Sequence, residues 1–203
     1  MYKFVVAVVR AYYKFFFGAK FHGIDNFPTE GGVLICPNHL SNNDPVILAG
    51  ILLGLRRMRF MAKKELFRIP VISSIVKYFG AFPIDRSTSD LGAVRATMSI
   101  LKEGNALVIF PEGRRNKEFR PEGIKPGALS IAAKAGVPIM PVYIKGKYRL
   151  FGKTEVFFGK LISPEVLREV AENAAKDSEN KNKILSRFLY DAIKQAEGDC
   201  NVD

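Results

Sequence analysis

Short apolar runs and longer amphipathic segments alternate along most of this chain. Runs of four or five apolar residues, clearest at 33–36 and 106–110, predict buried strands. Segments whose apolar positions lie three or four residues apart separate these runs and predict helices. The alternation predicts an α/β fold: a single domain with a mixed, largely parallel central sheet flanked by helices. The predicted strands are 21–24, 33–36, 59–61, 81–84, 106–110, 138–144 and 154–158, and the predicted helices are 45–55, 66–79, 91–102 and 128–135, with two more in 164–197.

Residues 1–19 form a separate amphipathic segment before the α/β domain of residues 20–203. Lys3, Arg10 and Lys14 recur at helical spacing and form a narrow basic stripe, while valines and aromatic residues fill most other positions. A membrane-spanning helix needs about 20 mostly apolar residues, and these cations interrupt the run. The pattern favours a helix lying in the membrane interface. A helix packed on the protein's own core, or against a partner, is the alternative.

The charge distribution favours anionic partners. Residues 1–163 carry 25 Lys and Arg against 11 Asp and Glu, whereas the tail, 164–203, carries 6 against 9, so the formal net charge of +11 is concentrated outside the tail. Such a field attracts phosphorylated substrates, anionic lipid, an acidic carrier protein or nucleic acid. Two cysteines, Cys36 in an apolar run and Cys200 in the polar tail, do not make a disulfide framework and favour a reducing compartment.

The first candidate for chemistry is His39, which follows the strand at 33–36 and precedes Asp44 by five positions. Sheet proteins of this class place ligands at the carboxyl ends of strands, and the polar residues at 41–43 form turns that allow Asp44 to reach the imidazole. An imidazole oriented by a carboxylate is a general base near neutral pH. Because no GxSxG turn supplies a nucleophilic serine, the pair would activate a hydroxyl that the substrate brings. The alternatives are a structural or surface histidine, and a helix-capping role for Asp44.

The second candidate is the turn from Phe110 to Arg115, Phe-Pro-Glu-Gly-Arg-Arg. Gly113 permits close backbone approach, and Arg114 and Arg115 offer fork-shaped donors suited to phosphate. Glu112, ionised beside two guanidinium groups, would orient an arginine or accept from a substrate hydroxyl. An exposed charged turn is the alternative. Three further cations lie where predicted strands or helices begin or end and are candidates for binding an anion: Lys64, Arg86 and Lys125.

Four blocks, in order, resemble those of the glycerolipid acyltransferases, particularly the bacterial 1-acyl-glycerol-3-phosphate acyltransferases. Asn38-His39 through Asp44 resembles the NHxxxxD block, Gly80 through Arg86 the second, Phe110-Pro111-Glu112-Gly113 the FPEG block, and Val137-Pro138-Ile139-Met140-Pro141 the last. The similarity spans residues 21–141. The family usually has Thr-Arg after FPEG, so Arg115 takes the place of the usual arginine and Arg114 is an added cation.

The resemblance implies that His39, oriented by Asp44, deprotonates the free glycerol hydroxyl of lysophosphatidic acid. The hydroxyl attacks a fatty acyl thioester carried on coenzyme A or acyl carrier protein, and phosphatidic acid and a free thiol result. Lys64, Arg86 and Arg115 would hold the acceptor's phosphate, with Glu112 and Gly113 shaping the site. The resemblance suggests no metal or redox cofactor, and places the enzyme at the cytoplasmic face of the membrane, in contact with anionic lipid.

Other functions remain open at this point. Within the same class, glycerol-3-phosphate or another lysophospholipid is an alternative acceptor. A thioesterase-like hydrolase, in which His39 activates water, belongs to a different class. A third is a non-catalytic membrane or nucleic-acid binder that uses the basic residues. No nucleic-acid-binding module and no GxGxxG or GxxxxGK[ST] phosphate loop occurs in the sequence, so no nucleic acid is expected as a partner and nucleotide chemistry is not favoured.

Overall fold

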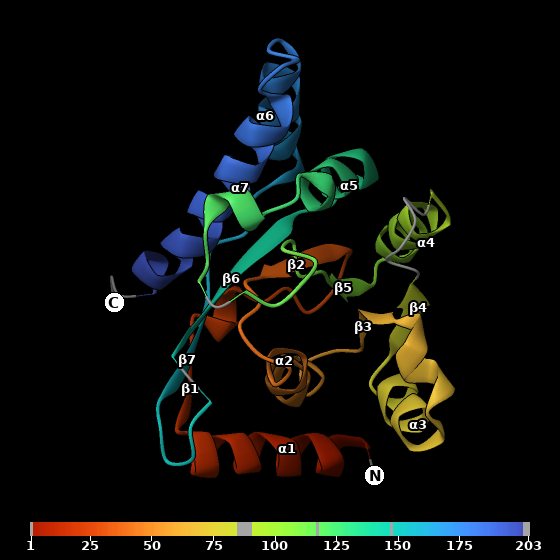
Figure 1. Cartoon of the computed structure of the whole chain (residues 1–203), viewed down its shortest axis with the longest axis vertical. Helices are drawn as coiled ribbons and strands as arrows, with labels where there is room; N and C mark the ends of the chain where they lie inside the picture. Colours follow the sequence, from red (N-terminus) through yellow and green to blue (C-terminus); the bar gives the residue numbers. More distant parts are fainter. Residues whose placement is uncertain (1, 85–90, 117, 147, 201–203) are drawn as a thin grey trace.

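A seven-stranded sheet forms the centre of the computed structural model, which describes residues 2–84, 91–116, 118–146 and 148–200 (Figure 1). The strand order is β1-β7-β6-β2-β5-β3-β4, and every neighbouring pair is parallel except β6–β7. The predicted α/β class with a mixed, largely parallel sheet is therefore confirmed. The strands are β1 (Ala19–His22), β2 (Val33–Pro37), β3 (Met58–Lys63), β4 (Ala81–Ile84), β5 (Ala106–Val108), β6 (Ile139–Gly146) and β7 (Thr154–Phe158).

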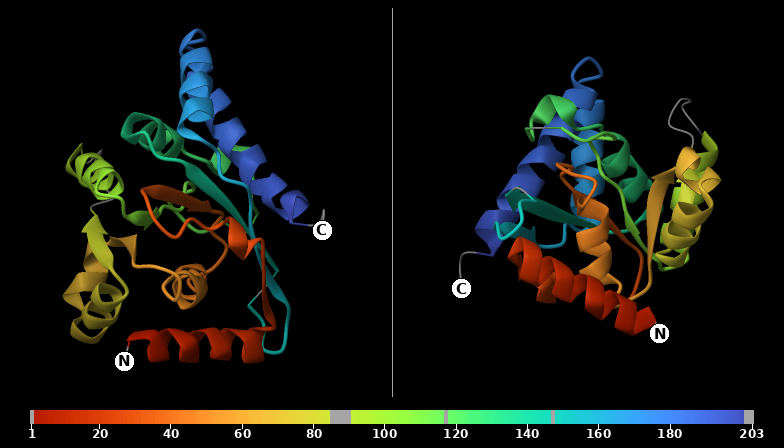
Figure 2. Two further views of the ribbon diagram at one scale, coloured as in Figure 1. Left: turned by 180° about the vertical axis from the view of Figure 1, so that it is seen from behind. Right: turned by 60° about the horizontal axis from the view of Figure 1, so that its bottom comes forward.

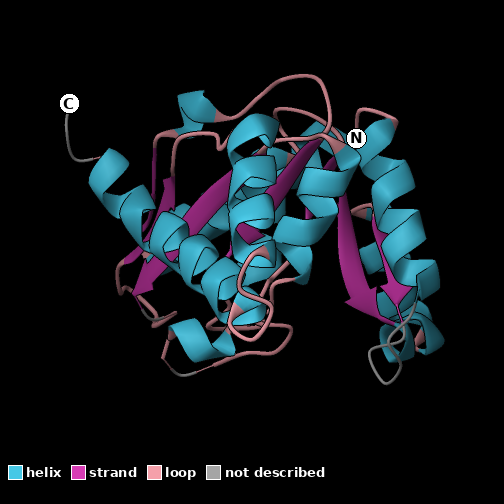
Figure 3. Cartoon of the chain, turned by 90° about the horizontal axis from the view of Figure 1, so that it is seen from above, coloured by secondary structure: helices cyan, strands magenta, loops and turns pink. Residues whose placement is uncertain are grey.

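Helices cover both faces of the sheet (Figures 1 and 3). The core between the sheet and α1–α2 is separate from the core between the sheet and α4–α7. The helices are α1 (Tyr2–Phe17), α2 (Asp44–Leu52), α3 (Pro70–Tyr78), α4 (Leu91–Lys102), α5 (Gly127–Ala135), α6 (Pro164–Ala175) and α7 (Lys181–Asp199), with 3-10 turns η1 (Ile24–Asn26), η2 (Lys64–Arg68) and η3 (Pro121–Gly123).

Strand β2 shows why a short apolar run becomes a central strand. All five of its residues are buried. Because successive side chains of a strand point to opposite faces, Val33 and Ile35 enter the core under α1 and α2, whereas Leu34 and Cys36 enter the core under α4–α7. Only a run without polar positions satisfies both cores, which explains the absence of period-two alternation here.

The connections that follow β2 and β5 diverge at one edge of the sheet. The two strands are parallel neighbours, so their carboxyl ends lie together. The chain then passes to α2 on one face after β2, and to α5 on the other face after β5. Divergence of this kind leaves a crevice at the strand ends, which is where α/β sheets bind ligands. Both predicted sites, the one at His39 and the one at 110–115, begin at this crevice.

Helix α1 packs on α2 through one side only (Figure 2). Val6 and Tyr13 are buried there, and a Cβ on Gly50 of α2 would lie 2.8 Å from a methyl group of Val9. Glycine thus permits close approach of the two helices. The alternative of packing on the protein's own core holds for this side. Among the described residues, no helix has the length and apolarity that crossing a membrane requires.

Several observed elements differ from the predicted bounds by two or three residues, among them β1 and α2, and two further differences have a clear physical cause. The single helix expected at 66–79 is divided into η2 and α3, with Ile69 extended between them (φ −93°, ψ 111°). Pro70 causes the break, because a residue that precedes proline is disfavoured in the α conformation. The strand expected at 106–110 ends at Val108. The backbone N–H of Ile109 still donates to Ile35 of β2, and Phe110 then leaves the sheet and lines the crevice beside His39.

Candidate active site

Asn38 anchors the loop that carries His39. Its side chain is fully buried and bonds both backbone groups of Ile144 on β6: Oδ1 accepts from the N–H at 2.6 Å, and Nδ2 donates to the carbonyl at 3.0 Å. A carboxamide makes both bonds because it has a donor and an acceptor side by side. The pair of bonds fixes where β2 ends, and therefore where the loop at 39–43 begins.

The loop at 39–43 folds around the carboxylate of Asp44. Asp44 Oδ2 lies 2.8 Å from His39 Nδ1 and accepts the backbone N–H groups of Leu40 (2.6 Å) and Ser41 (2.7 Å). An ionised carboxylate is an acceptor only, so Nδ1 must carry the proton in this bond. The lone pair of the neutral imidazole is then on Nε2, ready to accept a proton.

The structure does not show the alternative role of Asp44 as a helix cap. Asp44 is the first residue of α2, and no side-chain hydrogen bond caps this helix. Its fully buried carboxylate bonds to the preceding loop instead. Pro45 occupies the first turn of the helix, where its missing N–H needs no partner.

The turn after β5 holds His39 from three directions. The ring of Phe110 stacks on the imidazole, with centroids 4.1 Å apart. Glu112 Oε1 accepts the backbone N–H of His39 at 2.6 Å, and the backbone N–H of Asn116 donates to the His39 carbonyl at 3.0 Å. The imidazole therefore has a fixed position at the edge of the crevice, with 12% of its side chain exposed.

Glu112 has a different role from the one expected. It does not orient an arginine: one oxygen accepts from His39 and the other from the side chain of Asn116. Only 2% of the residue is exposed. Burial raises the pKa of Glu112 above its ordinary value, against the opposing effect of the hydrogen bonds from Asn116 and the His39 amide. Glu112 thus joins the two predicted sites into one.

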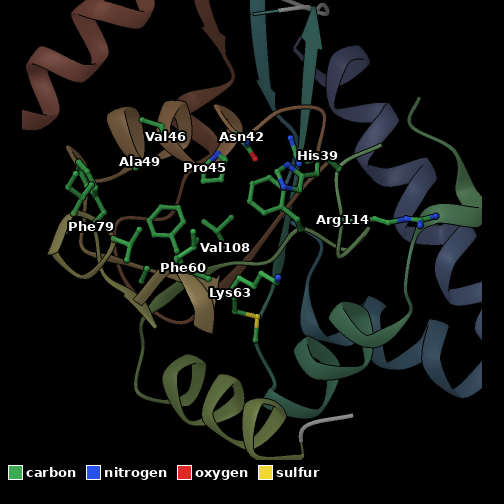
Figure 4. Close-up of a pocket in the computed structure, with 18 residues that line it drawn as sticks. His39, Asn42, Pro45, Val46, Ala49, Phe60, Lys63, Phe79, Val108 and Arg114 are labelled. Atoms are coloured by element: carbon green, nitrogen blue, oxygen red, sulfur yellow. The ribbon is translucent and has the colours of Figure 1, made fainter. Parts of the chain in front are cut away.

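An apolar pocket of about 750 Å³ extends from His39. Figure 4 shows His39 at one end and Phe79 at the other, with Val46 and Ala49 of α2 and Phe60 of β3 between them. The volume lies within the range of small-molecule sites, which are mostly apolar with a few placed polar groups. A histidine with a free acceptor nitrogen thus faces a cavity suited to a hydrocarbon chain.

The predicted cations fall into different positions around the pocket. Arg114 and Arg115 are exposed and line it, although the guanidinium of Arg114 extends away from His39 in Figure 4. Lys63, the last residue of β3, lines the pocket, whereas Lys64, the lysine named from the sequence, does not and begins η2. Arg86 lies outside the described residues.

Gly113 and Lys125 lie side by side in a second cavity, of about 590 Å³, that adjoins the same turn. Gly113 has φ 68°, a conformation that other residues rarely adopt, and a Cβ there would lie 3.2 Å from Lys125 Nζ. Glycine therefore serves the turn geometry and leaves room for the lysine. Among the described residues no group of three or more His, Cys, Asp or Glu side chains could hold a metal ion.

Comparison with known proteins assigns the family. Residues 18–145 match the Acyltransferase family. The chain belongs to this family. It is 32% identical over 200 residues to the 1-acyl-sn-glycerol-3-phosphate acyltransferase of Bacillus subtilis, covering 97% of each chain, and 30% identical over 189 residues to the enzyme of the same name from Streptococcus pneumoniae, covering 89% of this chain and 69% of that one.

A solved structure shows the same fold. The crystal structure of the 1-acyl-sn-glycerophosphate (LPA) acyltransferase PlsC from Thermotoga maritima superposes with a TM-score of 0.67 at 24% identity, over 97% of this chain and 80% of that one. The resemblance drawn from the four sequence blocks is thus confirmed at the level of the family. The protein is an O-acyltransferase of phospholipid biosynthesis.

Several residues of this acyltransferase site were not found from the sequence. The sequence pattern predicts Lys64 as the cation of this site, whereas the structure places Lys63 at the pocket; the alternation of side chains along a strand allows only one of the two to face it. Asn116 bonds Glu112 and the backbone of His39, and a polar residue six positions after Phe110 gives no signal of that role. A buried asparagine directly after a strand, such as Asn38, does predict a backbone clamp.

Replacing Glu112 with Gln is expected to remove one pH dependence of stability in this acyltransferase. A carboxyl whose pKa is raised by folding binds its proton more tightly when folded, so the stability associated with it is fully present at low pH. That stability is lost as pH rises from the ordinary value of 4.5 through the raised pKa of Glu112, at about 1.4 kcal/mol per pKa unit of difference.

Urea unfolding of both proteins from pH 4 to 8 measures this difference. The free energy of unfolding of the wild type, relative to Glu112→Gln, should fall across that window and be constant above it. Glu118→Gln is the matched control, because the Glu118 carboxylate is exposed and bonds the neighbouring Arg120. A relative stability of the wild type that rises with pH would show that Glu112 is stabilised as a carboxylate.

Proposed function

We propose that this enzyme transfers a fatty acyl group from an acyl thioester to the sn-2 hydroxyl of lysophosphatidic acid, giving phosphatidic acid. The observation that carries the proposal is the His39–Asp44 pair, 2.8 Å apart, at the end of an apolar pocket whose rim bears arginines. Lysophosphatidic acid and an acyl thioester are both anionic and amphiphilic, which matches this combination. The names of the relatives support the same acceptor.

In the proposed mechanism, His39 acts as a general base with Asp44 as its orienting partner. Nε2 accepts the proton of the substrate hydroxyl as the hydroxyl oxygen bonds to the thioester carbonyl carbon. The tetrahedral intermediate then expels the thiolate, which takes the proton from the imidazolium. Asp44 stabilises the imidazolium between these steps and does not itself become protonated. The acyl group ends on the glycerol oxygen, and the free thiol is the second product.

The apolar pocket is proposed to bind the acyl chain. Its walls are carbon-rich side chains from α2, β3, α3 and β5. Each CH₂ group removed from water there contributes about 0.8 kcal/mol to binding. Because His39 lies at one end, a chain that fills the pocket places its thioester carbonyl next to the imidazole. The cavity therefore supplies orientation as well as affinity.

The anionic group of the acceptor is assigned to Arg115. This side chain is exposed, lines the pocket, and follows the turn that holds His39. Changing Arg115 to Ala is expected to raise the apparent KM for lysophosphatidic acid by roughly tenfold or more, the effect of losing a charge-assisted hydrogen bond, while kcat changes little. Steady-state kinetics with each substrate varied in turn measures both constants.

The control for this substitution is Arg187→Ala, which removes an exposed arginine paired with Asp191 on α7. Kinetics of the control should equal those of the wild type. If Arg115→Ala leaves the acceptor KM unchanged but raises the KM for the thioester, Arg115 binds the acyl donor instead.

The proposed reaction is tested by crossing donors with acceptors. Acyl-coenzyme A and acyl carrier protein thioesters are each combined with lysophosphatidic acid, glycerol-3-phosphate or no acceptor, and both thiol release and the lipid product are measured. The proposal expects phosphatidic acid and thiol in equal amounts, and no thiol without lysophosphatidic acid. Thiol release without any acceptor would indicate a hydrolase, and acylation of glycerol-3-phosphate alone would change the acceptor. The donor that supports turnover identifies the acyl carrier.

We further propose that α1 lies against an anionic membrane. On the side of α1 away from α2, four large apolar residues are exposed: Phe4 (72%), Val8 (50%), Tyr12 (48%) and Phe15 (70%). Arg10 and Lys14 are exposed on the same helix. Apolar side chains with flanking cations are the composition of interfacial helices. The free thiols of Cys36 and Cys200 are consistent with the cytoplasmic face of that membrane.

The loop between β6 and β7 extends this apolar surface. Leu150 and Phe151 are 62% and 71% exposed, and the backbone N–H of Phe151 donates to the carbonyl of Phe16 at 2.6 Å. The ring of Phe151 contacts Phe15 and Phe16. The end of α1 and this loop therefore present one continuous apolar surface, which supports insertion into lipid rather than a single helix lying alone.

Replacing Phe4 and Phe15 with Ser is expected to weaken binding to liposomes that contain anionic lipid by at least about tenfold, because each buried phenylalanine contributes roughly 1.5–3 kcal/mol. Co-sedimentation measures the bound fraction. Substitution is preferred to deletion of 1–17, since deletion would also remove the buried Val6 and Tyr13. Val166→Ser/Ile184→Ser, on the exposed sides of α6 and α7, is the control. Undiminished binding of the α1 variant would refute the anchor.

A further inference from the structure

The carboxylate of Asp44 is only half satisfied. Oδ2 takes all three of its hydrogen bonds, whereas Oδ1 is buried and has no hydrogen-bond partner within the part of the chain that the structure describes. Buried polar atoms nearly always have a partner, and one that lacks it calls for an explanation. The demand is greater here because the atom belongs to a buried charged group.

A second buried atom without a hydrogen-bond partner belongs to a distant part of the chain. The hydroxyl of Tyr148, which follows β6, is also buried without a hydrogen-bond partner of normal geometry. Burial raises the pKa of Tyr148, and so do the charge of Asp44 and an interaction between the Tyr148 and Asp44 side chains. The hydroxyl therefore lies beside the carboxylate. Because its pKa is raised, Tyr148 keeps its proton at every working pH and acts as a donor.

Helix α1 and its neighbours hold the Tyr148 ring in place. Its centroid lies 6.3 Å from that of Tyr13 and 6.1 Å from that of Phe17, and both pairs meet edge to face. The hydroxyl of Tyr13 donates to Asn43 Oδ1 at 3.1 Å, and Asn43 immediately precedes Asp44. The aromatic side of α1 is thus linked both to the loop at 39–43 and to the tyrosine beside its carboxylate.

The other titratable groups around Asp44 already have partners. His39 bonds Oδ2, Tyr13 bonds Asn43, and Glu112, from the turn after β5, is an acceptor that bonds the His39 amide and Asn116. Of the groups that face Asp44 in the described residues, Tyr148 is the donor left for Oδ1.

We propose that Tyr148 is a positioning residue for acyl transfer, with its hydroxyl donating to Asp44 Oδ1. The bond fixes the plane of the carboxylate, so that Oδ2 stays directed at His39 Nδ1. It also withdraws part of the negative charge from the side that faces the imidazole. Tyr148 acts through Asp44 and contacts no substrate. The proposal rests on the proposed function, in which His39 is the base.

The test is the Tyr148→Phe variant, which removes only the hydroxyl and keeps the ring contacts with α1. At pH 7, kcat should fall roughly tenfold, as expected for the loss of one hydrogen bond to a charged group, with both KM values unchanged. The acidic limb of the kcat–pH profile should move to higher pH by about half a unit or more, because the carboxylate then holds the imidazolium more strongly.

Tyr143→Phe is the matched control. Tyr143 is a tyrosine of β6 whose hydroxyl accepts from Lys194, and its loss should leave the kcat–pH profile where it is. An unshifted profile in Tyr148→Phe would overturn the proposal, whether or not kcat or thermal stability falls, because a merely structural hydroxyl does not change the titration of the base.

A second measurement separates this inference from the proposed function. The chain has two histidines, and replacing His22 by Gln leaves one imidazole to follow by NMR. In that background, Tyr148→Phe should move the titration of the His39 ring to higher pH even if lysophosphatidic acid proves not to be the acceptor. An identical titration with and without the Tyr148 hydroxyl would refute the inference, whereas a shifted titration without acyl transfer would refute only the proposed function.

Discussion

Changing His39 to Ala is expected to lower kcat for acyl transfer by roughly 10²- to 10⁴-fold, the contribution of a positioned general base. The imidazole is the one group of the site that presents a free acceptor nitrogen to the pocket while its other nitrogen is held by Asp44. Without it, the glycerol hydroxyl must lose its proton to water. The effect should fall on kcat with little change in either KM, since the ring is not needed to hold the acyl chain or the phosphate.

The matched control is the only other histidine in the sequence. His22 lies on the edge strand β1, stacks on Phe157 and bonds Glu155. His22→Ala should retain full activity. Circular dichroism and thermal unfolding must show that His39→Ala is folded, because its ring also packs on Phe110. A folded His39→Ala variant with turnover within a few-fold of the wild type would remove the general-base mechanism.

The centre of the sheet could be predicted from the sequence because strands β2 and β5 are buried on both faces. A strand with cores on both sides has little room for a polar residue, so the apolar runs at 33–36 and 106–108 predict strands without reference to the rest of the fold. Helix α4 was bounded correctly for a related reason: its apolar periodicity ends at Lys102, and Gly104, with φ 81°, closes the turn. The sequence of a segment is enough to predict its secondary structure where that structure does not depend on contacts with distant segments.

Contacts between distant segments could not be predicted in this way. The approach of Asp44 to His39 spans five residues and was expected, and the structure places the two side chains 2.8 Å apart. The bond from His39 to Glu112 spans 73 residues, and Tyr148 is separated from Asp44 by more than 100. These two contacts depend on which strand ends lie together and on the course of the loop that follows each strand. Neither can be derived until the order of the strands in the sheet is known.

Helix α1 shows a further limit of prediction from the hydrophobic pattern. Valine and aromatic residues occur on most sides of this helix, so its sequence does not distinguish the side that packs on the protein from a side that faces lipid. The structure separates them: Val6 and Tyr13 are buried on α2, and Phe4 and Phe15 are exposed. Gly50 of α2 marks the packed side, because the lack of a side chain there lets Val9 approach α2 closely.

Changing Asp44 to Asn should slow acyl transfer by roughly 10³- to 10⁴-fold while leaving the loop at 39–43 folded. The amide oxygen can replace Oδ2 and accept from Leu40 and Ser41, so the backbone bonds that shape the loop persist. What is lost is the negative charge that stabilises the imidazolium. The carboxylate thus has two separable duties, to hold the loop as an acceptor and to support the base as an anion.

Asp44→Ala tests the separation, because it removes both duties. The partly buried N–H groups of Leu40 and Ser41 then lose their acceptor, at a cost to the free energy of unfolding of about 1 kcal/mol or more for each unsatisfied donor. Measurements of kcat and urea unfolding should therefore find Asp44→Asn slow with stability close to the wild type, and Asp44→Ala slow and clearly destabilised. The control is Asp191→Asn, which changes an exposed aspartate paired with Arg187 and should match the wild type in both kcat and stability.

Two outcomes would contradict this separation. If Asp44→Asn kept wild-type turnover, the negative charge would have no part in catalysis. If Asp44→Asn lost as much stability as Asp44→Ala, the loop at 39–43 would depend on the charge itself.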